Sequence, residues 1–244
     1  MKRTFADLHL RLNPNDSIEA KRVIAKAADL GYSLIAVPFP PEIRETEAEK
    51  LRSICVDAKI DFASRVDLYP RTKDQLTHLL RKLRRKFEVV CAVCENKEVA
   101  RQAAKDRRVD LLSFQSLDYR GRFFDWAEAE LASSSLAGLE VDVKPLLVLE
   151  GPARVRLLSC MRREVSIARE FHVPIVVSSG ASKALLLRKP RETAAFASLF
   201  GLDEIAALDA VSTNASTIVM RNREKLSRGF VAPGIRVVKE GRDC

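Results

Sequence analysis

Residues 34–37, Leu-Ile-Ala-Val, and residues 175–177, Ile-Val-Val, are short uninterrupted apolar runs that decide the fold class. A strand covered by helices on both faces of a parallel sheet is apolar throughout, whereas a half-exposed strand alternates between apolar and polar residues. The first run follows residues 18–30, whose apolar residues recur at helical spacing between a capping Asp16 and a terminating Gly31. A helix followed by a fully buried strand indicates a parallel α/β sheet.

The same alternation of helix and strand repeats along the 244 residues. Strand starts lie about 20 to 35 residues apart, which is the spacing of a βα unit, and the chain has room for seven or eight such units. A doubly wound open sheet would give the same local pattern. The number of units and the lack of a glycine-rich dinucleotide fingerprint after the first strand favour an α/β, TIM-barrel-like fold. The predicted strands are 4–8, 33–37, 60–66, 87–93, 109–114, 138–143 and 174–178.

The eighth unit of this barrel has no clear strand. Helical patterns cover 191–200, 203–210 and 213–226, and the next apolar run, 230–234, contains a proline and a glycine. We therefore predict a distorted or incomplete eighth unit. The predicted domain organisation is a single barrel domain over residues 1–228, followed by a basic C-terminal tail over residues 229–244 that packs loosely or becomes ordered on a partner.

The charge of the chain favours a polyanionic partner. Forty-two Lys and Arg against thirty-three Asp and Glu give a formal net charge of +9 and a pI near 9.5. The excess gathers in residues 71–86 and 221–242, which raises the local potential more than scattered charges would. A basic surface in contact with solvent alone is the alternative. We expect RNA or DNA as the partner.

Composition also predicts the compartment. No apolar run reaches the roughly eighteen residues of a membrane helix, and Asp7 stands where a signal peptide would continue its apolar stretch. Five cysteines, an odd number in a long chain, fit a reduced protein better than a disulfide scaffold. We predict a cytoplasmic protein that does not contact membranes.

Asp7 and His9 are the candidate metal ligands. Alternate residues of a strand share a face, so both side chains can reach one ion at the end of the first strand. A hydrolytic metal cluster needs further imidazoles and carboxylates, but the chain has only three histidines, and His78 and His172 are not placed at strand ends. We predict no metal and no cofactor, and a structural or RNA-facing role for His9.

Residues 178–183, Ser-Ser-Gly-Ala-Ser-Lys, form a candidate phosphate-binding turn. A small-residue turn that leads into a helix exposes backbone N–H groups, and Lys183 adds a positive charge. The spacing is not that of a Walker loop. An ordinary tight turn is the alternative, and a barrel enzyme that acts on a small anionic metabolite is the function that a phosphate site here would support.

Several motifs, in this order and at this spacing, resemble the archaeal ribonuclease P protein component 3 family. The resemblance runs from about residue 3 to about residue 238. The motifs are Phe5-Ala6-Asp7-Leu8-His9, Ser64-Arg65-Val66-Asp67, Asn96-Lys97-Glu98-Val99-Ala100-Arg101, Arg107 to Phe114, Leu139-Glu140-Val141-Asp142, Ser178-Ser179-Gly180-Ala181 and Ala207 to Asn214.

This resemblance implies a TIM barrel distantly similar to the polymerase and histidinol phosphatase (PHP) metallohydrolases. It also implies a protein subunit of ribonuclease P, which removes the 5′ leader from precursor tRNA while its RNA subunit performs the cleavage. Ribonuclease P protein component 2 is the implied direct partner, beside ribonuclease P RNA and the other ribonuclease P proteins. Arg11 stands where the second histidine of a metallohydrolase HxH pair would be. The resemblance therefore implies a subunit that is not catalytic alone, and a PHP-like phosphoesterase that uses Asp7 and His9 is the alternative.

A non-catalytic subunit would bind RNA through cations near strand and helix ends, and it would recognise backbone and shape rather than sequence. For Arg65 there is an alternative, since an arginine near the barrel axis can instead be the structural ion-pair partner of Glu140 or Asp142. The predicted RNA contacts are Arg11, Arg65, Arg101, Arg107, Lys183, Arg188, Arg191, Arg221 and Arg223.

Overall fold

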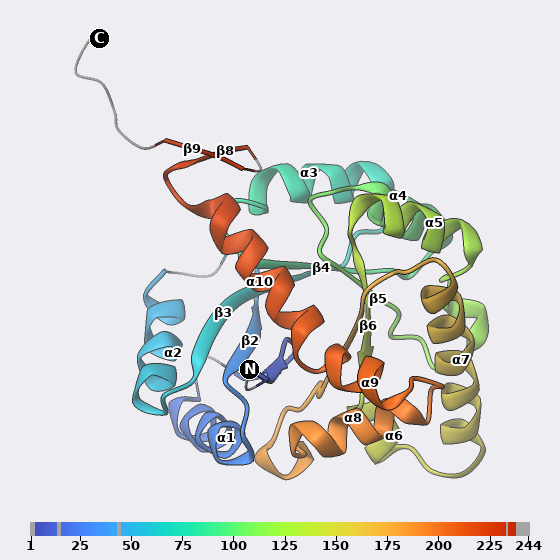
Figure 1. The fold of residues 1–244 in the computed structure, drawn as a ribbon, viewed down its shortest axis with the longest axis horizontal. Helices are drawn as coiled ribbons and strands as arrows, with labels where there is room; N and C mark the ends of the chain where they lie inside the picture. Colours follow the sequence, from blue (N-terminus) through green and yellow to red (C-terminus); the bar gives the residue numbers. More distant parts are fainter. Residues whose placement is uncertain (1–2, 14–15, 43–44, 233, 238–244) are drawn as a thin grey trace.

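A computed structural model describes residues 3–13, 16–42, 45–232 and 234–237 of the chain. Seven parallel strands pair in sequence order and curve into a nearly closed barrel surrounded by helices (Figure 1). This confirms the predicted TIM-barrel-like fold. The strands are β1 (Ala6–Asp7), β2 (Leu34–Phe39), β3 (Asp61–Leu68), β4 (Val89–Val93), β5 (Leu111–Ser113), β6 (Gly138–Asp142) and β7 (Ile175–Ser178).

Local capping explains where several helices begin and end. The Asp16 carboxylate accepts from Glu19 N at 3.0 Å, and Gly31 ends that helix with a left-handed φ of 98°. Among the described residues, no helix combines the length and hydrophobicity that crossing a bilayer requires. The helices are α1 (Ser17–Leu30), α2 (Glu45–Asp57), α3 (Lys73–Leu83), α4 (Lys97–Lys105), α5 (Trp126–Ser135), α6 (Lys144–Val148), α7 (Gly151–Glu170), α8 (Pro190–Ser198), α9 (Glu204–Ala210) and α10 (Thr213–Leu226).

The strands bury both of their faces, as the apolar runs predict. In β2, Leu34 and Ala36 belong to a cluster inside the barrel, whereas Ile35 and Val37 belong to the larger core between the barrel wall and the helices. Successive residues point to opposite faces, so a strand with a core on each side is apolar at every position.

The position of an eighth strand is filled by irregular backbone. No pairing joins β1 and β7 among the described residues, and the chain at the α9–α10 junction bridges them. Ala6 N donates to Val211 O at 3.0 Å, and Asn214 Nδ2 donates to Ile175 O at 2.8 Å. The predicted incomplete eighth unit is therefore confirmed.

Helix α10 closes one end of the barrel. Figure 1 shows it lying across the end at which the N-terminus is found, and Ala215, Ile218 and Val219 pack there against residues from the starts of the strands. After α10, β8 (Phe230–Ala232) and β9 (Ile235–Arg236) form a small antiparallel hairpin outside the barrel. Part of the predicted tail is thus paired backbone, and residues 238–244 lie outside the described residues.

Candidate functional site

Polar side chains converge at the end of the barrel opposite α10, where the strands finish, and we call this end the mouth. Six of them form three pairs two residues apart, because alternate residues of a strand project to the same side. All are buried or nearly so. The set, which we call the axial cluster, is Asp7 and His9 from β1 and its end, Arg65 and Asp67 from β3, Glu140 and Asp142 from β6, with Ser178 and Ser179 from the end of β7.

Arg65 is the centre of this cluster and is fully buried. Its two terminal nitrogens donate to the two carboxylate oxygens of Glu140, each at 2.6 Å, and its Nε donates to Asp67 Oδ1 at 2.7 Å. Nη1 also reaches Leu8 O at 2.7 Å, and Ser178 Oγ donates to Glu140 at 2.8 Å. Burial requires charges to be paired in this way.

The burial of Arg65 corrects its place among the predicted RNA contacts. A side chain with no exposed surface and four internal hydrogen bonds has nothing to offer an external phosphate in this structure. The structural alternative, an ion pair with Glu140, is what the structure shows.

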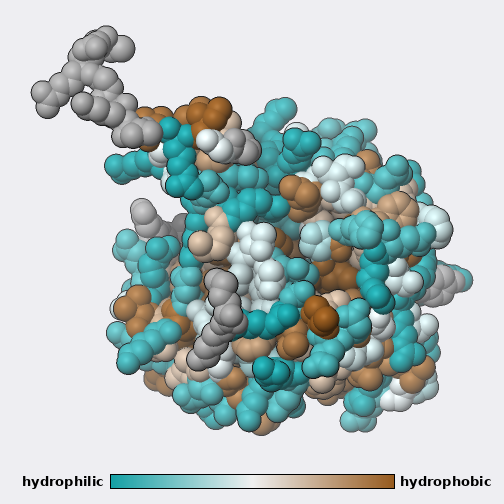
Figure 2. Space-filling model, in the orientation of Figure 1, coloured by the Kyte–Doolittle hydropathy of each residue, from teal (hydrophilic) through white to brown (hydrophobic). Residues whose placement is uncertain are grey.

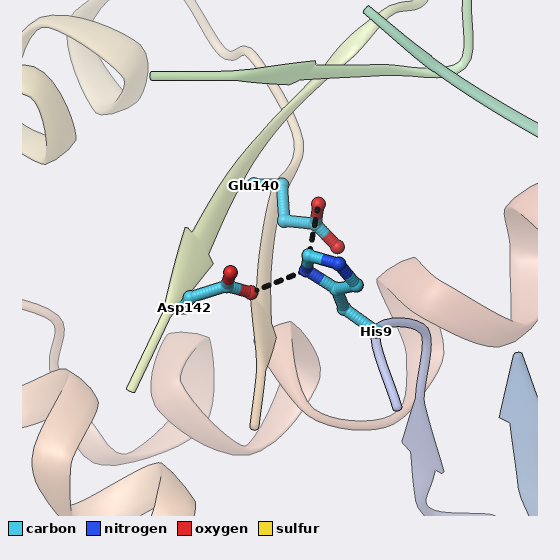
Figure 3. A group of neighbouring side chains, drawn as sticks. All are labelled: His9, Glu140 and Asp142. Carbon is cyan, nitrogen blue, oxygen red and sulfur yellow. Dashed lines mark hydrogen bonds and ion pairs between the residues drawn. The ribbon is translucent and has the colours of Figure 1, made fainter. Parts of the chain in front are cut away.

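His9 lies close to carboxylates from two strands, and Figure 3 shows the two from β6, Glu140 and Asp142. Its Nδ1 is 2.9 Å from Asp142 Oδ1, and its Nε2 is 3.2 Å from Asp67 Oδ2 and 3.0 Å from Nε of Arg11. Burial and Arg65 lower the pKa of His9, but Asp142 and Asp67 outweigh them and raise it to about 9. The protonated ring can only donate, so Asp67 is the partner of Nε2, and Arg11 is a neighbouring cation.

The axial cluster does not fit a metal ion. The ligand atoms of His9, Glu140 and Asp142 lie within 4.8 Å of one another, and this is the arrangement of side chains drawn in Figure 3. Both oxygens of Glu140 already accept from Arg65, and Nδ1 of His9 is held by Asp142. The carboxylates of Asp67, Glu140 and Asp142 already have His9, Arg11 and Arg65 as cationic neighbours. A divalent cation would have to displace these partners, because the ligand atoms are already hydrogen-bonded.

Asp7, the other predicted candidate ligand, has a different role. One of its carboxylate oxygens accepts from the backbone N–H groups of His9 and Ser179, at 3.2 Å and 3.0 Å, and thereby joins the ends of β1 and β7. Its other oxygen is buried without a hydrogen-bond partner among the described residues. Burial raises the pKa of this carboxyl, because desolvation penalises its charged form. The oxygen that is bonded in this structure is used to join two strand ends.

The turn at residues 178–183 supports the axial cluster. Ser179 N donates to Asp7, and Ala181 N donates to Ser179 Oγ at 3.0 Å. Gly180 has a left-handed φ of 61°, and a Cβ atom there would come within 3.0 Å of Asp142. Two of the N–H groups that a phosphate would need are therefore used internally, and the turn positions carboxylates.

The other predicted RNA contacts lie on several different elements of the barrel. Arg11 and Lys183 follow β1 and β7 at the mouth, whereas Arg221 and Arg223 lie on α10. Several are engaged: Arg101 with Glu128, Arg188 with the carbonyls of Leu185 and Leu187, Arg221 with Asp110, and Arg223 with Asp61 and Glu88. Arg107, Lys183 and Arg191 are exposed. The structure does not bring the nine residues together on one face.

The sequence did not predict two groups of buried ion pairs, one near the mouth and one near α10. Arg122 is buried against Glu164 by two hydrogen bonds of 2.6 Å and 2.5 Å, and it also holds Phe114 O at 2.6 Å. Asp110 forms ion pairs with Arg84, the C-terminal cap of α3, and with Arg221 of α10. Neither has a local sequence signal, because the partners lie far apart in the chain.

The fold and the axial cluster define a parallel α/β barrel protein with a buried network of ion pairs at the ends of its strands. The chain belongs to the family described as RNase P subunit p30, whose model matches residues 4–227. It is 30% identical over 240 residues to ribonuclease P protein component 3 of Methanosarcina barkeri, covering 98% of both chains. The protein of the same name from Methanocaldococcus jannaschii is 25% identical, covering 84% of this chain and 88% of the relative.

A solved structure confirms the fold. A chain of the cryo-EM structure of archaeal ribonuclease P with mature tRNA superposes with a TM-score of 0.85 at 22% identity, covering 98% of this chain and all of that one. The similarity extends across the incomplete eighth unit, so the whole barrel is shared and not only a common α/β core.

Proposed function

We propose that this chain is a non-catalytic subunit of ribonuclease P that binds and stabilises the catalytic RNA during 5′-leader removal from precursor tRNA. The observation that carries the proposal is the bidentate Arg65–Glu140 pair. It lies at the carboxyl ends of the strands, where barrel enzymes hold their catalytic groups, and it occupies the Glu140 carboxylate there. The net charge of +9 then supplies the chemistry of RNA binding, since each phosphate contact releases condensed counterions.

We propose ribonuclease P RNA and ribonuclease P protein component 2 as direct partners, with precursor tRNA engaged indirectly and other ribonuclease P proteins present in the assembly. The component 3 names of the relatives support this assignment. We further propose that the protein acts in the cytoplasm, and that residues 1–228 are one domain with residues 229–244 as an accessory segment.

Reconstitution tests the proposal. The purified chain is combined with ribonuclease P RNA, component 2 and precursor tRNA, and each component is omitted in turn while 5′-leader cleavage is measured. We expect cleavage to require the RNA, to be stimulated by this chain, and to be absent with this chain alone. Affinity for the RNA should fall steeply and linearly on a plot of log K against log salt concentration. A flat salt response would contradict an electrostatic role.

The alternative of a PHP-like phosphoesterase is tested on the same preparation. Purified chain is dialysed against zinc or manganese, and bound metal and phosphatase activity are measured for the wild type and for His9→Ala. We expect neither stoichiometric metal nor activity, because the axial ligand atoms are held by Arg65 and by one another. Stoichiometric metal with activity that His9→Ala removes would overturn the proposed function.

A further inference from the structure

We propose that Arg84, Arg107, Arg221 and Lys225, which we call the α10 cluster, bind the phosphate backbone of RNA at the end of the barrel opposite the mouth. This inference rests on the proposed function and adds to it the surface that meets the RNA. Arg84 caps α3, Arg107 lies in the turn between α4 and β5, and the other two belong to the last turns of α10.

One buried carboxylate holds the α10 cluster together. Asp110 Oδ2 accepts from Arg84 Nη1 at 2.5 Å and from Val90 N at 2.9 Å, and its Oδ1 accepts from Arg221 Nη2 at 3.2 Å. The Asp110 side chain is only 2% exposed, so its negative charge faces the protein interior and not the solvent. Four cations around one carboxylate leave a formal charge of +3 at this place.

The two outermost cations of the cluster are free for a ligand. Arg107 and Lys225 are exposed, and neither forms an ion pair with any described carboxylate. Partial burial lowers the pKa of Lys225, and the charges of Arg221, Arg84 and Arg107 lower it further against the opposing effect of Asp110. Mutual repulsion among cations means a positive local potential, which an incoming phosphate relieves.

The neighbouring arginines on this face show that the α10 cluster is distinct. Arg223 is paired with both Asp61 and Glu88, and Arg236 is paired with Glu224. Hydrophilic side chains gather over the upper end of α10, below the hairpin formed by β8 and β9 (Figure 2). Charge alone therefore does not mark the RNA surface, because Arg223 and Arg236 are held by their own carboxylate partners, whereas Arg107 and Lys225 have no ion pair with a described carboxylate.

The chemistry of the cluster favours nucleic acid over an acidic protein. Protein interfaces place aromatic and apolar side chains at their centre and are depleted of charge there, whereas phosphate backbones are held by Arg and Lys from several elements. The α10 cluster draws its four cations from three separate elements around a single acid. A contact made with phosphates alone would be independent of the RNA sequence.

Matched charge variants test the surface. Ribonuclease P RNA is titrated with wild type, with Arg107→Gln/Lys225→Gln, and with Lys21→Gln/Lys26→Gln, a control that removes two exposed cations from α1. Affinity is measured from low to high KCl, and circular dichroism with urea unfolding checks that each variant folds. We expect the α10 variant to lower the salt slope by about two units, because two phosphate contacts are lost, and the α1 variant to leave it unchanged.

Other results would overturn the inference and can be told apart from failure of the proposed function. Equal loss in both variants would mean that only net charge matters. Loss in Lys183→Gln/Arg191→Gln but not in the α10 variant would place the RNA at the mouth. An unchanged RNA slope with lost binding of component 2 would make the cluster a protein contact. Wild type that binds RNA with no salt dependence would remove the proposed function itself.

Discussion

Arg65 determines whether the axial cluster holds together, because two carboxylates depend on it. Removing one partner of a buried ion pair leaves the others charged and desolvated, which typically costs about 3–5 kcal/mol. We therefore expect Arg65→Met to lower the free energy of unfolding by that amount in urea titrations followed by circular dichroism. The double variant Arg65→Met/Glu140→Gln should recover part of the loss, since it removes a charge that Arg65→Met leaves unpaired.

The control for this experiment is Lys73→Met on the surface. Lys73 pairs with Glu98 at 3.4 Å, and both side chains are 58% exposed, so the change should be within about 0.5 kcal/mol. Equal destabilisation by the two substitutions would show that the buried pair has no special weight. Unchanged stability of Arg65→Met would mean that water or a rearranged side chain takes the place of the guanidinium.

His9 links the same cluster to pH. Its pKa is raised from 6.5 to about 9 in the folded protein, so protonation contributes stability that is complete below pH 6.5 and is lost as pH rises through 9. We expect His9→Gln to be less stable than wild type at pH 6, on the order of 2–3 kcal/mol, and to remove this part of the pH dependence. Urea unfolding from pH 6 to 10 measures it, with exposed His78→Gln as the control. A wild-type curve parallel to that of His9→Gln would contradict the protonated assignment.

The pairing inside the axial cluster shows how far residues can be predicted from sequence. Alternation along the first strand correctly placed Asp7 with His9, and the position of Arg65 near the barrel axis gave an ion pair with Glu140 or Asp142 as an alternative to an RNA contact. Alternation could not decide that Arg65 points inward to Glu140, because an arginine on a strand has the same local pattern whether it faces the axis or solvent. That choice depends on the register of β3 against β6 across the barrel, which is a property of the closed wall.

At the scale of elements, α10 is fastened to the wall by Arg223. Its guanidinium donates to Glu88, to both oxygens of Asp61 and to Phe62 O, at 2.5–3.0 Å, and so joins α10 to the start of β3 and to the residue that precedes β4. We expect Arg223→Met to destabilise the protein by about 1–3 kcal/mol, because these acceptors lose their charged donor, and to speed amide hydrogen exchange in α10.

Exposed Arg228, just after α10, provides the matched comparison. Arg228→Met removes the same charge without a described carboxylate partner, and it should leave stability and exchange rates unchanged. If both variants weaken RNA binding equally while neither changes stability, Arg223 would be an RNA contact, as its sequence position predicts, and its internal pairs would be incidental.

The elements themselves were predictable where periodicity was strong. All seven barrel strands and the helices after β7 coincide with their sequence patterns. The substitute for the eighth strand was not predictable in form, since a bridge made by Val211 O and the Asn214 side chain has no repeating apolar signal. Within the apolar run at 230–234, residues 230–232 form β8, which pairs with β9 outside the barrel.

The distribution of charge over the whole molecule decides what the C-terminal segment contributes. Residues 229–244 hold three basic and two acidic residues, a net charge of +1, so the other 228 residues carry +8 of the total +9.

We expect a chain truncated after Arg228 to fold with a free energy of unfolding within about 1 kcal/mol of wild type, because β8 and β9 pair with each other and not with the barrel. The same truncation should change the salt slope of RNA binding by at most about one unit. Urea unfolding and RNA titration in KCl test both statements on one sample. A truncated chain that fails to fold would make the segment part of the domain, and a fall of several units in the slope would make it the main RNA contact despite its low net charge.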